Sequence, residues 1–241
     1  MNNVRNTDLP VRAESDVDEP TVVRTEHLTR CFGTGTGTVV AVRGVTVTVA
    51  CHDRIALTGP SGSGKSTLLH LLAGLDEPTS GTMSWLPAEP STARPAAGLV
   101  FQGRSLVPNL DVIENVRLPL LFAGHPEREA TACAREALAR LGVDALSEAL
   151  PDALSGGQAQ RVAIARVLAS APRLILADEP TGQLDHATAA LVIDVLLRAA
   201  DELSAALIVS THDPVIARRL PTEWAMRDGR LRITTSDENQ R

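Results

Sequence analysis

Hydrophobic and polar residues alternate with a period of two in the first ordered part of the chain. The segment GVTVTVA (44–50) alternates valine with threonine, which predicts a half-buried strand of the kind found in antiparallel sheets. The stretches TVVRTEHL (21–28) and VVAV (39–42) have the same β-like composition. GTGTG (33–37) predicts a flexible connection inside this layer.

A different pattern begins at IALTG (55–59), a short apolar strand that leads into a glycine-rich loop. The following segment, STLLHLLAGL (66–75), has helical periodicity, and Gly74 is well placed to end it. A strand, a glycine loop and a helix in this order predict the start of a parallel α/β unit. GTMSW (81–85) and AAGLVF (96–101) are two further short strands, separated by a proline-rich connection.

From Pro108 to Pro172 the chain is rich in alanine and leucine and shows no strand pattern. EREATACAREALARLG (127–142) predicts one helix that ends at Gly142, and GQAQRVAIARVLAS (157–170) predicts another that Pro172 stops. This region is expected to be an inserted helical lobe.

The β pattern returns in LILAD (174–178) and ALIVST (206–211), with a helix over about 186–203 between them. Both runs are continuously apolar, as strands buried on two faces should be. WAMRDGRLRI (224–233) predicts a closing hairpin with Asp228-Gly229 at its turn.

Composition narrows the class of protein. The 241 residues are 44% hydrophobic and carry a formal net charge of −6, which favours a globular protein and argues against nucleic acid as a partner. Three widely spaced cysteines predict a reduced compartment. Residues 1–20 are expected to be a disordered tail without a targeting signal, and 234–241 a second tail. No apolar run is long enough to span a bilayer, so a membrane role would require a partner chain.

The glycine loop carries the first chemical motif, G-x-x-x-x-G-K-[ST]. It comprises Gly59, Pro60, Ser61, Gly62, Ser63, Gly64, Lys65, Ser66 and Thr67. Backbone N–H groups in such a loop, together with a helix N-terminus, form an anion site, and glycines are expected because a Cβ would hold phosphates off the backbone. Lys65 is the only lysine, so the other 22 of the 23 basic residues are arginine, as expected if this position requires a compact ammonium. The motif predicts a bound nucleoside triphosphate, with Lys65 on its β- and γ-phosphates and Ser66 on Mg²⁺.

The strand LILAD supplies the second motif. Asp178 at its end is predicted to hold the hydration shell of Mg²⁺ beside Ser66. Glu179 follows at once and is predicted to accept a proton from an attacking water.

The third motif is Leu154 followed by Ser155, Gly156, Gly157 and Gln158, at the start of a helix. The run LSGGQAQRVAIARVLASAPRLILADEPTGQLD closely resembles the ATP-binding cassette (ABC) ATPases. The resemblance covers about 21–233 and implies an α/β fold: a P-loop NTPase (RecA-like) core (21–107 and 173–233) with an antiparallel β subdomain and an inserted α-helical subdomain (108–172). It also implies that LSGGQ of one copy closes over the ATP of a second copy, in a head-to-tail dimer.

The same resemblance assigns roles to single residues. Gln102 matches the glutamine that contacts Mg²⁺ and water, His212 the histidine that contacts the γ-phosphate, and Asp185 the aspartate loop at the dimer interface. Phe32 lies where the family has an aromatic residue that stacks on adenine. The chain has no tyrosine, so Phe32 would have to stack by π-contact without a hydroxyl. Core packing is an equally good interpretation of Phe32.

GPSGSGKSTLLHLLAGLD, ENVRLPLLFAG and DEPTGQLD are most similar to the lipoprotein-release, macrolide-export and cell-division branch. The resemblance therefore implies an ATP-hydrolysing subunit that powers a separate membrane permease, located in the cytoplasm on the inner face of the membrane. A regulatory ATPase that signals through a membrane partner is the alternative. An ABC protein of the repair or translation type is disfavoured, because such proteins usually carry paired cassettes or long insertions, which this chain lacks.

Overall fold

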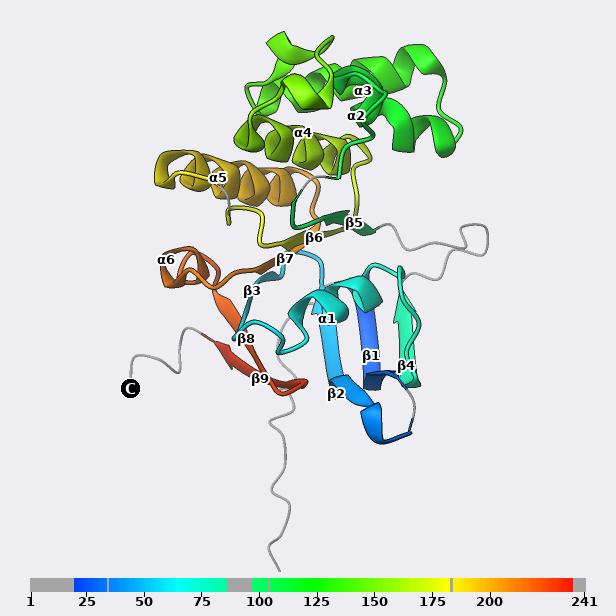
Figure 1. The fold of residues 1–241 in the computed structure, drawn as a ribbon, viewed down its shortest axis with the longest axis vertical. Coiled ribbons are helices and arrows are strands. Elements are labelled where there is room, and N and C mark those ends of the chain that lie inside the picture. The colour runs from blue at the N-terminus through cyan, green and yellow to red at the C-terminus, as the bar shows by residue number, and fades with distance from the viewer. Residues whose placement is uncertain (1–19, 34, 86–96, 104, 183, 236–241) are drawn as a thin grey trace, which may run out of the picture.

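The computed structural model describes residues 20–33, 35–85, 97–103, 105–182 and 184–235. The expected N-terminal tail and the proline-rich connection after Trp85 lie outside these residues, apart from Pro20. Figure 1 shows a helical region at one end of the molecule, a small sheet at the other end and a larger sheet between them.

The larger sheet has six strands in the order β5-β6-β7-β3-β8-β9. Its members are β5 (Ala97–Val100), β6 (Leu174–Asp178), β7 (Ala206–Ser210), β3 (Arg54–Thr58), β8 (Thr222–Arg227) and β9 (Arg230–Thr235). The first five are parallel, and β9 pairs antiparallel with β8 through the predicted turn at Asp228-Gly229. Every residue of β6 and β7 is buried, which confirms the expectation from their apolar runs. β9 continues to Thr235, so the strand includes two residues that we expected in the tail.

The smaller sheet is antiparallel and has the order β2-β1-β4. It consists of β1 (Thr21–Phe32), β2 (Val39–Ala50) and β4 (Ser80–Trp85), with a short 3₁₀ turn, η1 (Gly35–Gly37), between β1 and β2. VVAV and GVTVTVA belong to the single strand β2. From Val45 to Val49 its valines are buried and its threonines exposed, as the alternation predicted.

Helix α1 (Lys65–Leu72) joins the two sheets. Its four leucines pack in one core with valines of β1 and β2 and with apolar residues of β3 and β6. The helix ends at Leu72, and Gly74, which we expected to end it, follows two residues later with a φ of +67°. This left-handed conformation is typical of the residue that terminates a helix.

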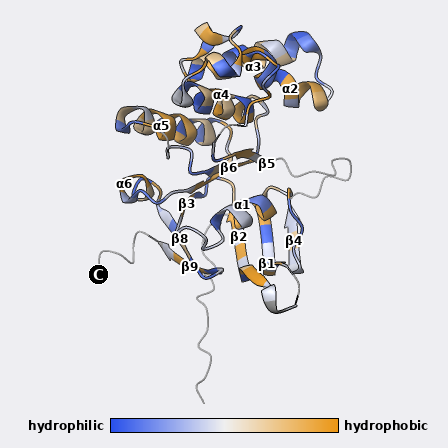
Figure 2. Cartoon of the chain, viewed as in Figure 1, coloured by the Kyte–Doolittle hydropathy of each residue, from blue (hydrophilic) through white to orange (hydrophobic). Residues whose placement is uncertain are grey.

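The region between β5 and β6 is helical, as predicted. It contains α2 (Val112–Phe122), α3 (Glu127–Arg140) and α4 (Gly156–Ala169), with the short 3₁₀ turns η2 (Asp144–Leu146) and η3 (Pro151–Ala153). Beyond β6 come α5 (His186–Glu202) and α6 (Pro214–Ala217). Figure 2 shows hydrophobic and hydrophilic residues interspersed along α2 to α5, as expected for helices with one buried face. Among the described residues, no helix has the length and apolar character needed to cross a bilayer.

Candidate nucleotide site

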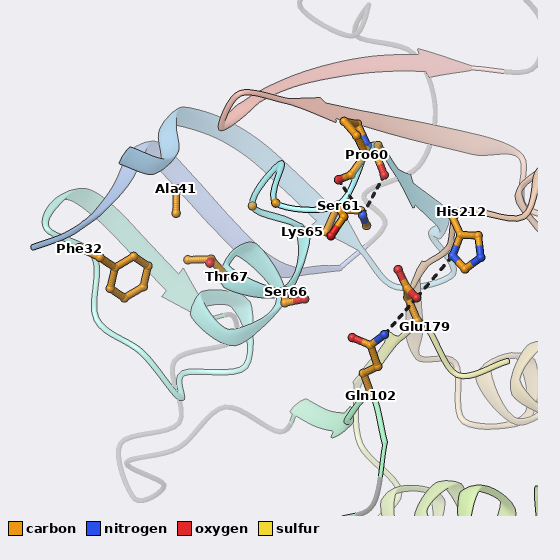
Figure 3. A pocket seen from close by; sticks show the side chains of 13 residues that line it. Phe32, Ala41, Pro60, Ser61, Lys65, Ser66, Thr67, Gln102, Glu179 and His212 are labelled. Atoms are coloured by element: carbon orange, nitrogen blue, oxygen red, sulfur yellow. Dashed lines mark hydrogen bonds and ion pairs between the residues drawn. The ribbon is translucent and has the colours of Figure 1, made fainter. Parts of the chain in front are cut away.

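A cavity of about 580 Å³ lies where the loop between β3 and α1 meets residues from both sheets (Figure 3). Phe32 lies at one end, the loop lies in the middle, and Gln102, Glu179 and His212 lie together at the other end. The cavity is lined by Phe32, Ala41, Gly59, Pro60, Ser61, Gly62, Gly64, Lys65, Ser66, Thr67, Gln102, Glu179 and His212. The structure therefore brings together most of the residues that the sequence singled out.

The glycines of the loop are required first by the chain's own backbone. A Cβ on Gly59 would lie 2.1 Å from the carbonyl oxygen of Met226, and one on Gly64 would lie 2.0 Å from that of Ala41. Both glycines have positive φ angles, +140° and +104°. At Gly62 a Cβ would meet nothing within 4 Å, although its φ of +76° still favours glycine. Contact with phosphate, which we expected to explain all three glycines, is thus not the main constraint at Gly59 and Gly64.

The β8–β9 turn stabilises the phosphate loop through backbone hydrogen bonds. Gly229 donates its backbone N–H to the carbonyl oxygen of Ser63 over 3.1 Å and accepts from the backbone N–H of Arg43 over 2.8 Å. The sequence marked 228–229 as a turn and gave no sign that it supports the phosphate loop. The sequence also did not reveal the contacts of Ala41 and Met226 with the loop, because both residues make them through their backbone oxygens.

Lys65 carries the positive charge of the loop. Its side chain lies across the loop, and Nζ donates to the carbonyl oxygens of Gly59 (2.8 Å) and Pro60 (3.2 Å). The residue is only 7% exposed, and none of the described carboxylates lies within ion-pair distance of Nζ. An ammonium has three donors, so one remains for an anion in the cavity. A buried charge without a counter-ion is costly, and a bound phosphate would offset that cost.

The N-terminus of α1 also points to an anion. Its N-cap residue is Gly64, which offers no side-chain hydrogen bond to the first turn. The first N–H groups of an α-helix have no partner within the helix, and here Lys65, Ser66 and Thr67 line the cavity. The loop and the helix end therefore fit the phosphates of a nucleotide.

Glu179 stands at the opposite end of the cavity between two polar side chains. Its Oε2 accepts from Nε2 of Gln102 over 3.2 Å and lies 3.4 Å from Nδ1 of His212. The Glu179 side chain is 19% exposed, whereas that of His212 is 69% exposed. A carboxylate that is shielded yet open to the cavity can accept a proton from water.

The backbone of Glu179 is strained. Its φ is +44°, in the left-handed region, although Pro180 follows and restricts it further. Its N–H donates to Ser210, toward both the carbonyl oxygen (3.2 Å) and Oγ (3.0 Å). The hydroxyl of Ser210 in turn donates to Oδ1 of Asp178 over 2.5 Å. Asp178 is buried and is not among the residues that line the cavity.

Phe32 is the last residue of β1 and is 43% exposed. The ring is therefore not packed in the core, and the core-packing interpretation of Phe32 is wrong. It lines the end of the cavity remote from Glu179.

The LSGGQ residues and Asp185 do not line this cavity. Ser155 is the N-cap of α4: its Oγ accepts from the backbone N–H of Gln158 (3.2 Å), whose Oε1 accepts from the backbone N–H of Ser155 (2.8 Å). Asp185 caps α5 by accepting from the backbone N–H groups of Ala187 and Thr188, and hydrogen bonds, chiefly from the hydroxyl of Thr188, lower the pKa of its carboxyl. Both helix starts are exposed to solvent.

Comparison with known proteins agrees with this geometry. The family profile described as "ABC transporter" matches residues 42–182, more than half of the chain. The chain belongs to the ABC transporter family. It is an ATP-binding subunit of that family and an ATPase.

Several relatives of the ABC transporter family cover most of the chain. Proteins named "Lipoprotein-releasing system ATP-binding protein LolD" from Legionella pneumophila and Gluconobacter oxydans are 40% and 42% identical, respectively. Each match covers 87% of this chain, and 96% and 94% of the two relatives.

A solved structure is also similar throughout. The ATP-binding cassette MJ0796, a dimer in a post-hydrolysis state bound to ADP and Pi, is 32% identical with a TM-score of 0.81. The match covers 88% of this chain and 98% of that one. These similarities confirm the predicted ABC cassette fold, with a parallel sheet, an antiparallel β subdomain and a helical region.

Proposed function

We propose that this ABC subunit hydrolyses ATP in a site that two copies of the chain complete together. The main support is that the residues expected to act on one ATP lie in two separate places on the chain. The phosphate loop, Glu179 and His212 share one cavity, whereas Ser155 at the start of α4 is exposed and lies outside it. A second anion-seeking helix start with no phosphate of its own is accounted for if it faces the nucleotide of another copy. The dimeric state of the similar cassette MJ0796 supports this arrangement.

In this proposal the nucleotide lies along the cavity, with its base near Phe32 and its phosphates at the loop. Phe32 would stack on the adenine through its π face. Backbone N–H groups from Gly62 to Thr67 would hold the phosphates, with Lys65 on the β- and γ-phosphates and the remaining loop residues, Gly59 to Ser61, shaping the turn. From the other copy, Ser155, Gly156, Gly157 and Gln158 would reach the γ-phosphate, and Asp185 would lie at the interface.

Magnesium fits the donors present. The hydroxyl of Ser66 and the side chain of Gln102 line the cavity, and the carboxylate of Asp178, the residue before Glu179, would hold the hydration shell of the ion. The described residues contain no group of three or more His, Cys, Asp or Glu that could form a complete metal cage. Mg²⁺ is usually held by one or two protein ligands together with substrate phosphates and waters, so this sparse set suits it. When bound, the ion would offset the charge of the β- and γ-phosphates.

Hydrolysis would depend on Glu179 as the residue that orients the attacking water and accepts its proton. Gln102 and His212 hold the Glu179 carboxylate from two sides, and the open side of His212 would contact the γ-phosphate. Lys65 and Ser155 of the other copy would stabilise the charge on the transferred phosphoryl group.

The work of hydrolysis would be passed to a separate permease in the membrane, with this subunit on the cytoplasmic face. The relatives named for lipoprotein-releasing systems support placing the chain in that branch. The helical subdomain between β5 and β6 is the expected docking region, because Gln102 connects it directly to the cavity.

Glu179→Gln tests the proposal. The amide keeps the shape of the side chain but cannot accept a proton, so ATP should bind and turn over at least about 100-fold more slowly. Size-exclusion chromatography with ATP and Mg²⁺ should then show a dimer that disappears with ADP. A variant that stays monomeric at saturating ATP would contradict the shared site.

A further inference from the structure

A salt bridge behind the adenine end of the cavity has no role in the function described so far. Arg30 lies two residues before Phe32 on β1, and its guanidinium carbon lies over the Phe32 ring, 4.7 Å from the centroid. The same guanidinium binds Asp76 through Nε to Oδ2 and Nη2 to Oδ1, both 2.8 Å. We propose that Arg30, held by Asp76, is a positioning residue that fixes the Phe32 ring for adenine. This inference rests on the proposed stacking role of Phe32.

The ring needs such support because little else holds it. Phe32 ends its strand, is 43% exposed, and has no hydroxyl that could form a hydrogen bond. Gly33 follows with a φ of +82°, and the glycine turn η1 comes next. An aromatic ring at such a position is free to change rotamer, and ordering it on binding would cost entropy. A cation on one face restrains the ring and leaves the other face for the base.

Arg30 is well fixed for this role. The bidentate geometry with Asp76 orients the plane of the guanidinium, and both side chains are only about one-quarter exposed, at 26% and 24%. A lysine could neither form the fork nor stack its plane on the ring, so arginine is the appropriate residue.

Asp76 connects this support to the helix that binds phosphate. It lies just beyond the end of α1, in the segment that leads to β4. That segment is fastened to β1, since Thr79 donates its N–H to the carbonyl of Thr29 (2.8 Å) and accepts from the N–H of Cys31 with its hydroxyl (3.0 Å). The start of α1 would thus hold the phosphates while the segment after its end holds the base-stacking ring.

The proposal can be tested by calorimetric titration of the 241-residue chain with ADP and Mg²⁺. ADP is used because the chain does not hydrolyse it. Arg30→Ala should weaken ADP binding about two- to fivefold, as expected from one partly exposed cation–π contact. The turnover rate at saturating ATP should stay within about twofold of the parent, because the phosphate end is untouched. Arg24→Ala is the matched control, an exposed arginine on the same strand, and should change neither value.

A double-mutant cycle separates positioning from general damage. Asp76→Ala alone should also weaken ADP binding, but it should add nothing in the Arg30→Ala background, since Asp76 acts through Arg30. Arg30→Lys should recover only part of the affinity. Additive effects of the two alanine variants, or a loss of saturated turnover that parallels the loss of affinity, would overturn the proposal.

Phe32→Ala distinguishes this inference from the function on which it rests. If Phe32→Ala weakens ADP binding at least fivefold while Arg30→Ala leaves it unchanged, Phe32 stacks on the base and the proposed role of Arg30 is wrong. If Phe32→Ala itself leaves ADP binding unchanged, the stacking assignment fails, and the positioning role fails with it.

Discussion

At the scale of single residues, the phosphate loop is constrained from two sides. The nucleotide needs close approach to the backbone, but Ala41 and Met226 already press carbonyl oxygens against Gly64 and Gly59. Glycine is therefore required at these positions by the packing of the chain itself as well as by nucleotide binding.

Gly64→Ala tests this distinction, with Gly62→Ala as its control. The new Cβ at position 64 would meet the Ala41 oxygen at 2.0 Å with φ at +104°, so we expect a loss of more than about 2 kcal/mol in the free energy of unfolding. At position 62 only the backbone conformation opposes alanine, which costs about 1 kcal/mol. Urea unfolding without nucleotide measures both. Equal losses would show that the backbone contact is unimportant.

Lys65→Met keeps the length of the side chain and removes its charge. The free donor for the phosphates disappears, so ATP affinity should fall at least about 30-fold. The fold should survive, because methionine avoids burying an unpaired cation. Equilibrium binding of a fluorescent ATP analogue and a thermal melt measure the two effects, and undiminished affinity would contradict the assigned role.

At the scale of elements, the segment between β5 and α2 links the cavity to the helical subdomain. Asn115 on α2 is fully buried and donates to the carbonyl oxygens of Val107 (3.1 Å), Leu110 (2.9 Å) and Asp111 (3.0 Å). Its Oδ1 accepts from the N–H of Val107 over 2.7 Å. From α4, Arg166 donates to the carbonyl and the hydroxyl of Ser105, and burial lowers the pKa of this guanidinium. The segment after Gln102 is thus tied to two helices.

Asn115→Ala should break this connection. Several buried backbone groups would lose their partner, so the free energy of unfolding should drop by about 2–3 kcal/mol. Turnover should also fall, since Gln102 would no longer be held beside Glu179. Asn109→Ala, at an exposed position of the same segment, is the control for both the unfolding and the ATPase measurements.

The elements show where sequence patterns were sufficient. β2 followed from the alternation of its residues, and β6 and β7 followed from their continuous apolar runs, because burial on one or two faces determines which positions are apolar. The supports of the site left no such mark. Arg166 and Arg30 act on residues 61 and 46 positions away, Asn115 acts on an irregular segment just before its own helix, and Ala41 and Met226 act through backbone atoms. A pattern along the chain does not encode such contacts.

At the scale of the whole molecule, the proposed active sites are shared between two copies. Ser155 and Glu179 come from different regions, and only Glu179 reaches the cavity of its own chain. If the sites are shared, an inactive Lys65→Met copy and an inactive Ser155→Arg copy should complement each other, because the mixed dimer contains one intact site.

Mixing the two variants in equal amounts should restore about a quarter of the parent ATPase rate, since half of the dimers are mixed and each has one working site. Each variant alone should be inactive, while the Ser155→Arg copy should still bind ATP. A mixture as inactive as its components, measured above the dimerisation concentration, would contradict a site built in trans.

The left-handed backbone at Glu179 has a consequence for the evolution of this chain. Glycine would relax that conformation, so a Glu179→Gly chain would fold more favourably while losing the carboxylate that we propose activates water. Under selection for thermal stability alone, Glu179 would be replaced before the residues that maintain the fold. The carboxylate ahead of Pro180 therefore comes at a cost in the free energy of folding.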